Sequence, residues 1–115
     1  MEITYRIDKD ILYVSINGRV DASNASEAET KIIALKNENA DKHLVIDADG
    51  LEYISSAGLR VILRLRKENP KLAVINVASD VYEVFDMTGF TDMINIQKAY
   101  RRLSIDGCEM LGKGA

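Results

Sequence analysis

One short, mostly apolar segment with helical patterns on both sides constrains the fold of this chain more than any other feature. Residues 43–48 read His-Leu-Val-Ile-Asp-Ala, as is typical of a strand buried on both faces of a sheet. Apolar residues recur every three or four positions in residues 25–35 and again in residues 59–65, which indicates two amphipathic helices. A helix between consecutive buried strands calls for a parallel crossover, which is right-handed in nearly all known cases. The pattern therefore predicts an α/β fold.

The residues ahead of this unit predict an antiparallel hairpin. Apolar and polar residues alternate from Ile3 to Ile7, residues 8–10 form a polar turn, and residues 11–16 resume as a second strand. Residues 17–21 are then expected to leave the sheet and lead to the first helix.

Three further elements are expected after the second helix. Residues 71–77 predict another buried strand, residues 79–87 a third helix that ends at Gly89, and residues 93–96 the last strand. The complete pattern predicts an open mixed β-sheet with an N-terminal hairpin and crossover helices packed on it.

Two adjacent serines stand where the second helix is expected to begin. Ser55 and Ser56 are both candidates for the helix N-cap, and Pro70 lies just past the expected end of the helix. A functional interpretation is also open, because a helix N-terminus stabilises negative charge. A phosphoryl group on a serine here would gain roughly 0.3 to 1 kcal/mol from the helix dipole. The surface charge could therefore change without unfolding the chain.

Residues 55–59, Ser-Ser-Ala-Gly-Leu, resemble the phosphorylation-site segment of STAS domains, the anti-sigma factor antagonist family. That segment typically runs aspartate, serine, serine or threonine, glycine, leucine. Position by position, the phosphoacceptor of the family falls on Ser56, while Ser55 replaces the preceding aspartate and Ala57 the following hydroxyl residue. Residues 84–94 are similar to the end of the third helix in the same family, and the resemblance covers about residues 3–103.

The resemblance implies a phosphorylation-regulated protein-interaction module of signal transduction and transcription regulation. Such a module binds an anti-sigma factor or a related serine kinase while Ser56 is unphosphorylated. The loop of Gly18 and Asp21 resembles the family loop that lies beside the phosphorylation site and contributes to partner recognition, although Asp21 or Ser23 could equally be a helix cap. A scaffold or sensory STAS module, with or without weak nucleotide binding near Ser56, is the alternative. The expected partner-binding residues are Asp21, Ser55, Ser56, Gly58, Arg60 and Arg64.

Three basic residues share one face of the expected second helix. Arg60, Arg64 and Lys67 follow one another at spacings of four and three, opposite the apolar stripe. Such a face is usually only solvated. The alternative interpretation is that these side chains attract an acidic partner, because they lie within a few turns of Ser56.

Bulk properties disfavour several other classes of function. With 15 basic and 18 acidic residues, no tryptophan and two phenylalanines, the chain offers little for binding nucleic acid. Its one cysteine and one histidine, Cys108 and His43, cannot form a disulfide or a metal cluster within the chain, so a reducing compartment fits and no cofactor is expected. We expect neither an enzyme, since His43 precedes the central strand at the end away from the serines, nor a membrane span. A cytoplasmic location is the default expectation, and the sequence leaves the oligomeric state open.

The last residues do not fit the domain pattern. Residues 104–115 read as a strand followed by Gly-Lys-Gly, similar to the entry into the glycine-rich loop of protein kinases. We therefore expect a STAS-like domain in residues 1–103 and a separate tail in residues 104–115. The tail is either a mobile terminus or the truncated start of a kinase-like domain.

Overall fold

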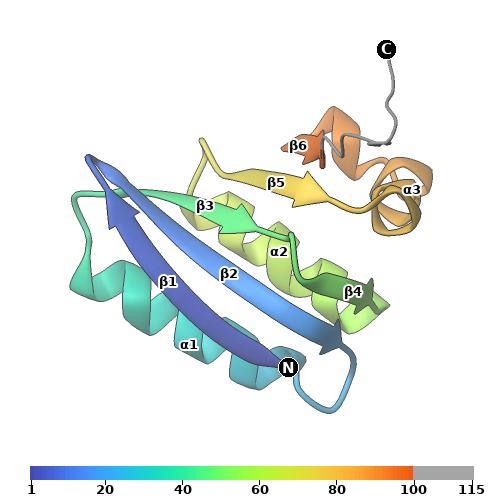
Figure 1. Cartoon of the computed structure of the whole chain (residues 1–115), viewed down its shortest axis with the longest axis horizontal. Helices are drawn as coiled ribbons and strands as arrows, with labels where there is room; N and C mark the ends of the chain where they lie inside the picture. The colour runs from blue at the N-terminus through green and yellow to red at the C-terminus, as the bar shows by residue number, and fades with distance from the viewer. Residues whose placement is uncertain (100–115) are drawn as a thin grey trace, which may run out of the picture.

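A mixed sheet forms the centre of the computed structural model, which describes residues 1–99 (Figure 1). Within these residues the strand order is β1-β2-β3-β5-β6, and β4 pairs with the far end of β2. The strands are β1 (Glu2–Asp8), β2 (Ile11–Val20), β3 (His43–Asp47), β4 (Leu51–Ile54), β5 (Ala73–Val77) and β6 (Asn95–Lys98). The helices are α1 (Ala25–Glu38), α2 (Ser56–Glu68), α3 (Ser79–Met87) and the short 3₁₀ helix η1 (Phe90–Asp92).

The predicted hairpin and crossovers are confirmed. Strands β1 and β2 pair antiparallel, whereas β2 with β3, β3 with β5 and β5 with β6 all pair parallel. The three helices provide the connections between these parallel strands, as the sequence predicted. Gly89 follows α3 with φ +80°, a left-handed conformation that glycine adopts without steric cost and that ends the helix.

The expectation that residues 17–21 leave the sheet is wrong. Strand β2 continues to Val20, and its last three residues pair in parallel with β4, a strand that the sequence pattern did not predict. Asn17-Gly18 looks like a turn in sequence, but Gly18 adopts φ +97° inside the strand. The register between β2 and β4 shifts just after it, because Gly18 pairs with Leu51 and Arg19 with Tyr53, which leaves Glu52 of β4 as the extra residue of the bulge. Strand β2 therefore continues past Gly18.

The last strand also starts later than residues 93–96 predicted. Met93 and Ile94 lie in the turn after η1, and both of their backbone amides donate to the carbonyl of Phe90. Ile94 is buried as part of the core, which explains the apolar pattern that resembles the start of a strand. Strand β6 begins at Asn95.

Helices α1 and α2 lie on the same face of the sheet (Figure 1). The strand residues that point toward them alternate along each strand and are aligned across strands, so that Leu12 lies beside Leu44, and Ile46 beside Val74. All four are at most 2% exposed. Helix α3 lies past the end of β5 near β6 (Figure 1), and its Phe85 is buried against Phe90 with ring centroids 5.9 Å apart.

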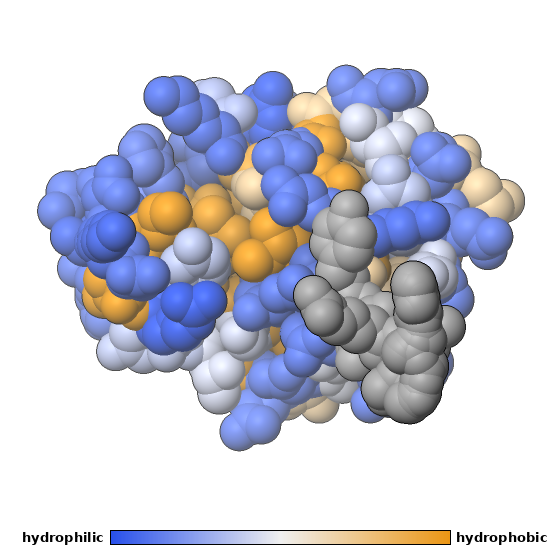
Figure 2. All heavy atoms as spheres, turned by 45° about the horizontal axis from the view of Figure 1, so that its top comes forward, coloured by the Kyte–Doolittle hydropathy of each residue, from blue (hydrophilic) through white to orange (hydrophobic). Residues whose placement is uncertain are grey.

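The opposite face of the sheet carries no helix in the described residues. Its alternate positions hold half-buried apolar side chains, among them Ile11, Val45 and Ile75. Figure 2 shows apolar side chains gathered among polar ones on the side of the molecule formed by the strands. The core therefore lies on one side of the sheet only.

Gly58 allows the first turn of α2 to pack directly on the ends of β2 and β4. A Cβ atom at this position would lie 2.6 Å from Cγ1 of Ile54 and 2.9 Å from Cγ1 of Val20. Both of those atoms are close to the backbone of buried residues and have little room to move. The first turn of α2, where the two serines lie, can thus approach the sheet this closely only because residue 58 is a glycine.

We expect Gly58→Ala to destabilise the protein by about 1 to 3 kcal/mol, as overpacking of a filled core does. Helix propensity alone predicts the opposite sign, a gain of roughly 0.5 to 1 kcal/mol. Urea denaturation decides between the two. Ala34→Gly, at an exposed position of α1, calibrates the propensity term in the same protein. A more stable Gly58→Ala variant would show that the contact is not tight.

Candidate functional site

The two serines at the start of α2 have different structural roles. Ser55 is the N-cap, and its Oγ accepts a hydrogen bond of 3.3 Å from the amide of Gly58. Its own amide donates to the carbonyl of Val20 at 2.9 Å, which ties the start of the helix to the end of β2. Ser56 is the first residue of the helix and is exposed, as the sequence predicted. Within residues 1–99 its hydroxyl makes no hydrogen bond, in contrast to that of Ser55.

The loop between β2 and α1 is held by side-chain hydrogen bonds of Asp21. Oδ1 of Asp21 accepts from the hydroxyl of Ser23 at 2.6 Å and from its amide at 2.9 Å. These bonds stabilise the ionised carboxylate, the hydroxyl bond most strongly, and they keep the pKa of Asp21 below its ordinary value. The loop therefore presents a fixed negative charge at the same end of the sheet as Ser56.

Neither Asp21 nor Ser23 occupies the helix N-cap, which is Asn24. The Asn24 side chain makes no capping bond. Its Oδ1 instead accepts from the amide of Asp21 at 2.9 Å, and its Nδ2 donates to the carbonyl of Arg19 at 2.9 Å. The Asn24 side chain thus holds the loop against the end of β2. The sequence analysis did not predict this role for Asn24.

A cation–π pair beside the serines was missed by the sequence analysis. The guanidinium of Arg19 lies 4.3 Å from the ring centroid of Tyr53, and Tyr53 is 40% exposed. The pair exists because Arg19 and Tyr53 are partners in the register of β2 and β4. Since the sequence pattern predicted neither β4 nor this part of β2, it gave no signal for the contact.

Not every residue expected at the partner surface is exposed. Gly58 is buried and acts on the site through packing, whereas Arg60 is exposed one turn after Ser56. Asp21 and Ser55 are half-buried. The structure therefore brings Asp21, Ser55, Ser56 and Arg60 to one end of the molecule and places Gly58 beneath them.

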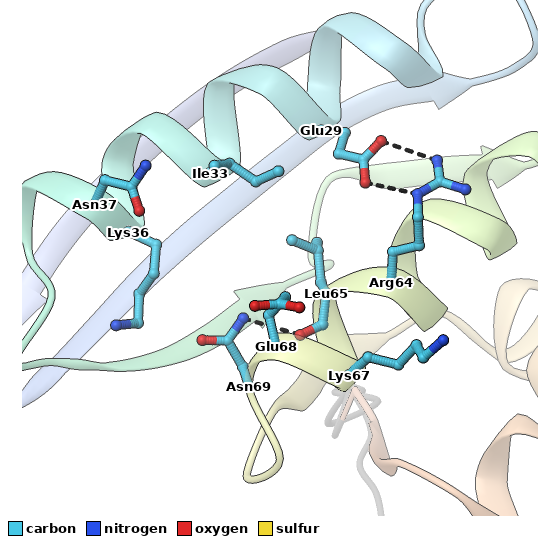
Figure 3. Close-up of a pocket in the computed structure, with 9 residues that line it drawn as sticks. All are labelled: Glu29, Ile33, Lys36, Asn37, Arg64, Leu65, Lys67, Glu68 and Asn69. Atoms are coloured by element: carbon cyan, nitrogen blue, oxygen red, sulfur yellow. Dashed lines mark hydrogen bonds and ion pairs between the residues drawn. The ribbon is translucent and has the colours of Figure 1, made fainter.

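Arg64 binds a carboxylate of the neighbouring helix. Its Nε and Nη2 donate to the two carboxylate oxygens of Glu29 in α1 at 2.8 and 2.9 Å (Figure 3). The pair stands at one end of a groove between α1 and α2 with a volume of about 450 Å³, and it lowers the pKa of Glu29. Of the three basic side chains expected on this face, Arg64 is thus neutralised by Glu29, whereas Arg60 and Lys67 have no ion pair within residues 1–99.

His43 lies far from the serines, as expected. It pairs with Ile11 at the beginning of β2, whereas Ser55 bonds to Val20 at the end of the same strand. A nucleophilic role for either serine would have to do without this histidine.

Two further observations concern residues 1–99 only. None of their helices is long and apolar enough to cross a membrane, and no three of their acidic, histidine or cysteine side chains gather as metal ligands would. The expected tail in residues 104–115, the domain boundary at residue 103 and Cys108 lie outside the described residues.

Comparison with known proteins agrees with this architecture. Residues 2–103 match the family model described as STAS domain. The chain belongs to the STAS domain family. It is 31% identical over 100 residues to a candidate anti-sigma factor antagonist of Bordetella bronchiseptica, BtrV, and the match covers 84% of this chain and 85% of that relative.

Solved structures of STAS proteins share the fold. The crystal structure of an anti-sigma factor antagonist from Mycobacterium paratuberculosis superposes with a TM-score of 0.76 at 20% identity, over 84% of each chain. The Bacillus cell fate determinant SpoIIAA, solved in its phosphorylated form, superposes with a TM-score of 0.61 at 14% identity, over 83% of this chain and 90% of that one. At these identities the likeness establishes the open mixed sheet and its helices.

We expect Ser23→Ala to raise the pKa of Asp21 toward its ordinary value of 3.8, because the strongest of the bonds to the carboxylate is lost. A carboxyl with a lowered folded-state pKa stabilises the fold above its unfolded pKa and loses that contribution as the pH falls through the folded value. The stability deficit of Ser23→Ala should therefore be largest near neutral pH and shrink in acid. Carboxyl carbon NMR titration measures the pKa, and Ser26→Ala in α1 is the control. An unchanged Asp21 titration in Ser23→Ala would contradict the assignment.

The Arg64–Glu29 pair should contribute little to stability, because Arg64 is 54% exposed. We expect a coupling of less than about 1 kcal/mol in a double-mutant cycle of Arg64→Gln and Glu29→Gln. The pKa of Glu29 should rise in Arg64→Gln. Thermal unfolding and NMR titration give the two quantities. A coupling well above this range would mean that the pair holds α1 against α2.

Proposed function

We propose that this protein is an anti-sigma factor antagonist that binds an anti-sigma factor, or a related serine kinase, while Ser56 is unphosphorylated. Membership of the STAS family and the similarity to the candidate anti-sigma factor antagonist of Bordetella bronchiseptica support this proposal. The protein then acts in the cytoplasm as a phosphorylation-regulated interaction module of transcription control. It binds its partner without a cofactor and without contacting nucleic acid or membrane.

The observation that carries the proposal is the separation of roles between the two serines. Ser55 supplies the hydrogen bond that caps α2, and exposed Ser56 supplies none to the fold. A kinase can therefore modify Ser56 without removing a cap, a loss that typically costs about 1 kcal/mol. Helix α2 also has no acidic residue in its first turn, where the dipole favours one.

Phosphorylation would act on the contact through charge and desolvation. A phosphoserine carries about −1.5 to −2 charges, and it would lie at the same end of the sheet as the ionised carboxylate of Asp21. If the partner offers no arginine, the free-energy cost of burying this charge in the interface would exceed about 1.4 kcal/mol, the amount that changes affinity tenfold. The unphosphorylated surface, by contrast, requires the burial of only one hydroxyl.

Other residues at this end of the sheet complete the proposed partner surface. Arg60 and the Arg19–Tyr53 pair supply cationic and aromatic groups of the kind enriched at interface hot spots. Arg64 has a smaller role, since Glu29 compensates its charge. Ser55 and Gly58 contribute by holding the first turn of α2 in place.

We expect phosphorylation of Ser56, or Ser56→Asp, to weaken binding of the anti-sigma factor partner by tenfold or more, about 1.4 kcal/mol. The melting temperature should stay nearly constant, because the added charge lies at a favourable helix end. Ser56→Ala should bind whether or not the kinase is present. Isothermal titration calorimetry and thermal unfolding measure these effects.

Ser55 is the internal control for this experiment. Mass spectrometry after treatment with the cognate kinase should find phosphate on Ser56, and phosphate on Ser55 would mean that the assigned position is wrong by one residue. If neither serine is modified and Ser56→Asp binds like the wild type, the switch is refuted. Binding without regulation would then favour a scaffold or sensory module.

A further inference from the structure

The three arginines of α2 differ in what they contact. Arg64 forms its two-bond pair with Glu29, and Nε of Arg66 donates to the carbonyl of Met93 at 3.2 Å. Arg60 is exposed and has neither a hydrogen bond nor an ion pair within residues 1–99. It is also the arginine nearest to Ser56 along the helix.

The helix itself offers Arg60 no anion. The residues three and four positions away are Ser56, Ala57, Leu63 and Arg64, so its neighbours in the next turn include a like charge and in the preceding turn a hydroxyl. Long side chains on a helix point back toward its N-terminus. We therefore expect the guanidinium of Arg60 to lie over the turn that begins with Ser56.

We propose that Arg60 binds the phosphate of phosphorylated Ser56, an inference that rests on the proposed function. An anion four residues before a cation is the favourable order for an ion pair on a helix surface. A guanidinium binds phosphate oxygens through two parallel hydrogen bonds, which an ammonium cannot do. The phosphate thereby supplies the anion that residues 1–99 do not provide for Arg60.

Through this contact, phosphorylation would change the proposed partner surface in two ways. The phosphate adds negative charge at Ser56, and it withdraws Arg60, the arginine of α2 that has neither a hydrogen bond nor an ion pair within residues 1–99, from any acidic group of the partner. Arg60 thus influences how much phosphorylation lowers the affinity for the partner. No movement of the backbone is required.

The test needs no partner protein. Phosphoserine is incorporated genetically at position 56, and its second ionisation, near pH 6 in the free residue, is followed by ³¹P NMR. We expect this pKa to be lower in the wild type than in Arg60→Gln by about 0.3 unit or more, since an i,i+4 ion pair favours the dianion. Arg60→Lys should lie between the two. Lys67→Gln, which removes one exposed charge near the other end of α2, should titrate like the wild type.

Equal titration of the wild type and Arg60→Gln would overturn the proposal, even if phosphorylation still weakens partner binding. A second readout is the Nε–Hε resonance of Arg60, which should shift on phosphorylation and stay unshifted if no contact forms. The proposed function fails independently, when the phosphorylated protein binds its partner with unchanged affinity. Because Arg60 is exposed, its variants should remain folded, and thermal unfolding checks this.

Discussion

The close approach of helix α2 to the ends of β2 and β4 is the contact on which the proposed site depends. Gly58 has no side chain, so the first turn of the helix can pack on Val20 and Ile54. The same approach brings the amide of Ser55 within 2.9 Å of the Val20 carbonyl, and this bond fixes where the helix begins. Ser56, the next residue, is exposed at the start of the helix beside the end of β2.

Charges of both signs lie at the same end of the molecule as Ser56. The carboxylate of Asp21 is held ionised by Ser23, while Arg19 is stacked on Tyr53 and Arg60 stands one turn along the helix. In the proposed function, a phosphate on Ser56 would change the balance of these charges on the surface that the partner contacts. The α1–α2 ion pair stands apart from this arrangement, since Glu29 compensates Arg64 (Figure 3).

Much of this architecture could be predicted from the sequence because it depends on local patterns. Apolar spacing identified the hairpin, the crossover helices and the buried strands, and Ser55-Ser56 marked the start of α2. The pattern failed where the backbone departs from regular geometry. Gly18, with its positive φ inside β2, looked like a turn, and the buried Ile94 looked like the start of a strand although it follows a 3₁₀ helix.

The sequence by itself determined the family, the order of the main elements and the position of Ser56, because motifs and periodicity are properties of neighbouring residues. Only the tertiary structure decided which side chains meet. The pairing of Arg19 with Tyr53 depends on the register of two strands, the binding of Arg64 by Glu29 depends on the packing of two helices, and the need for Gly58 depends on the distance between helix and sheet. Each of these joins residues far apart in the chain or in different elements, and no local pattern specifies such contacts.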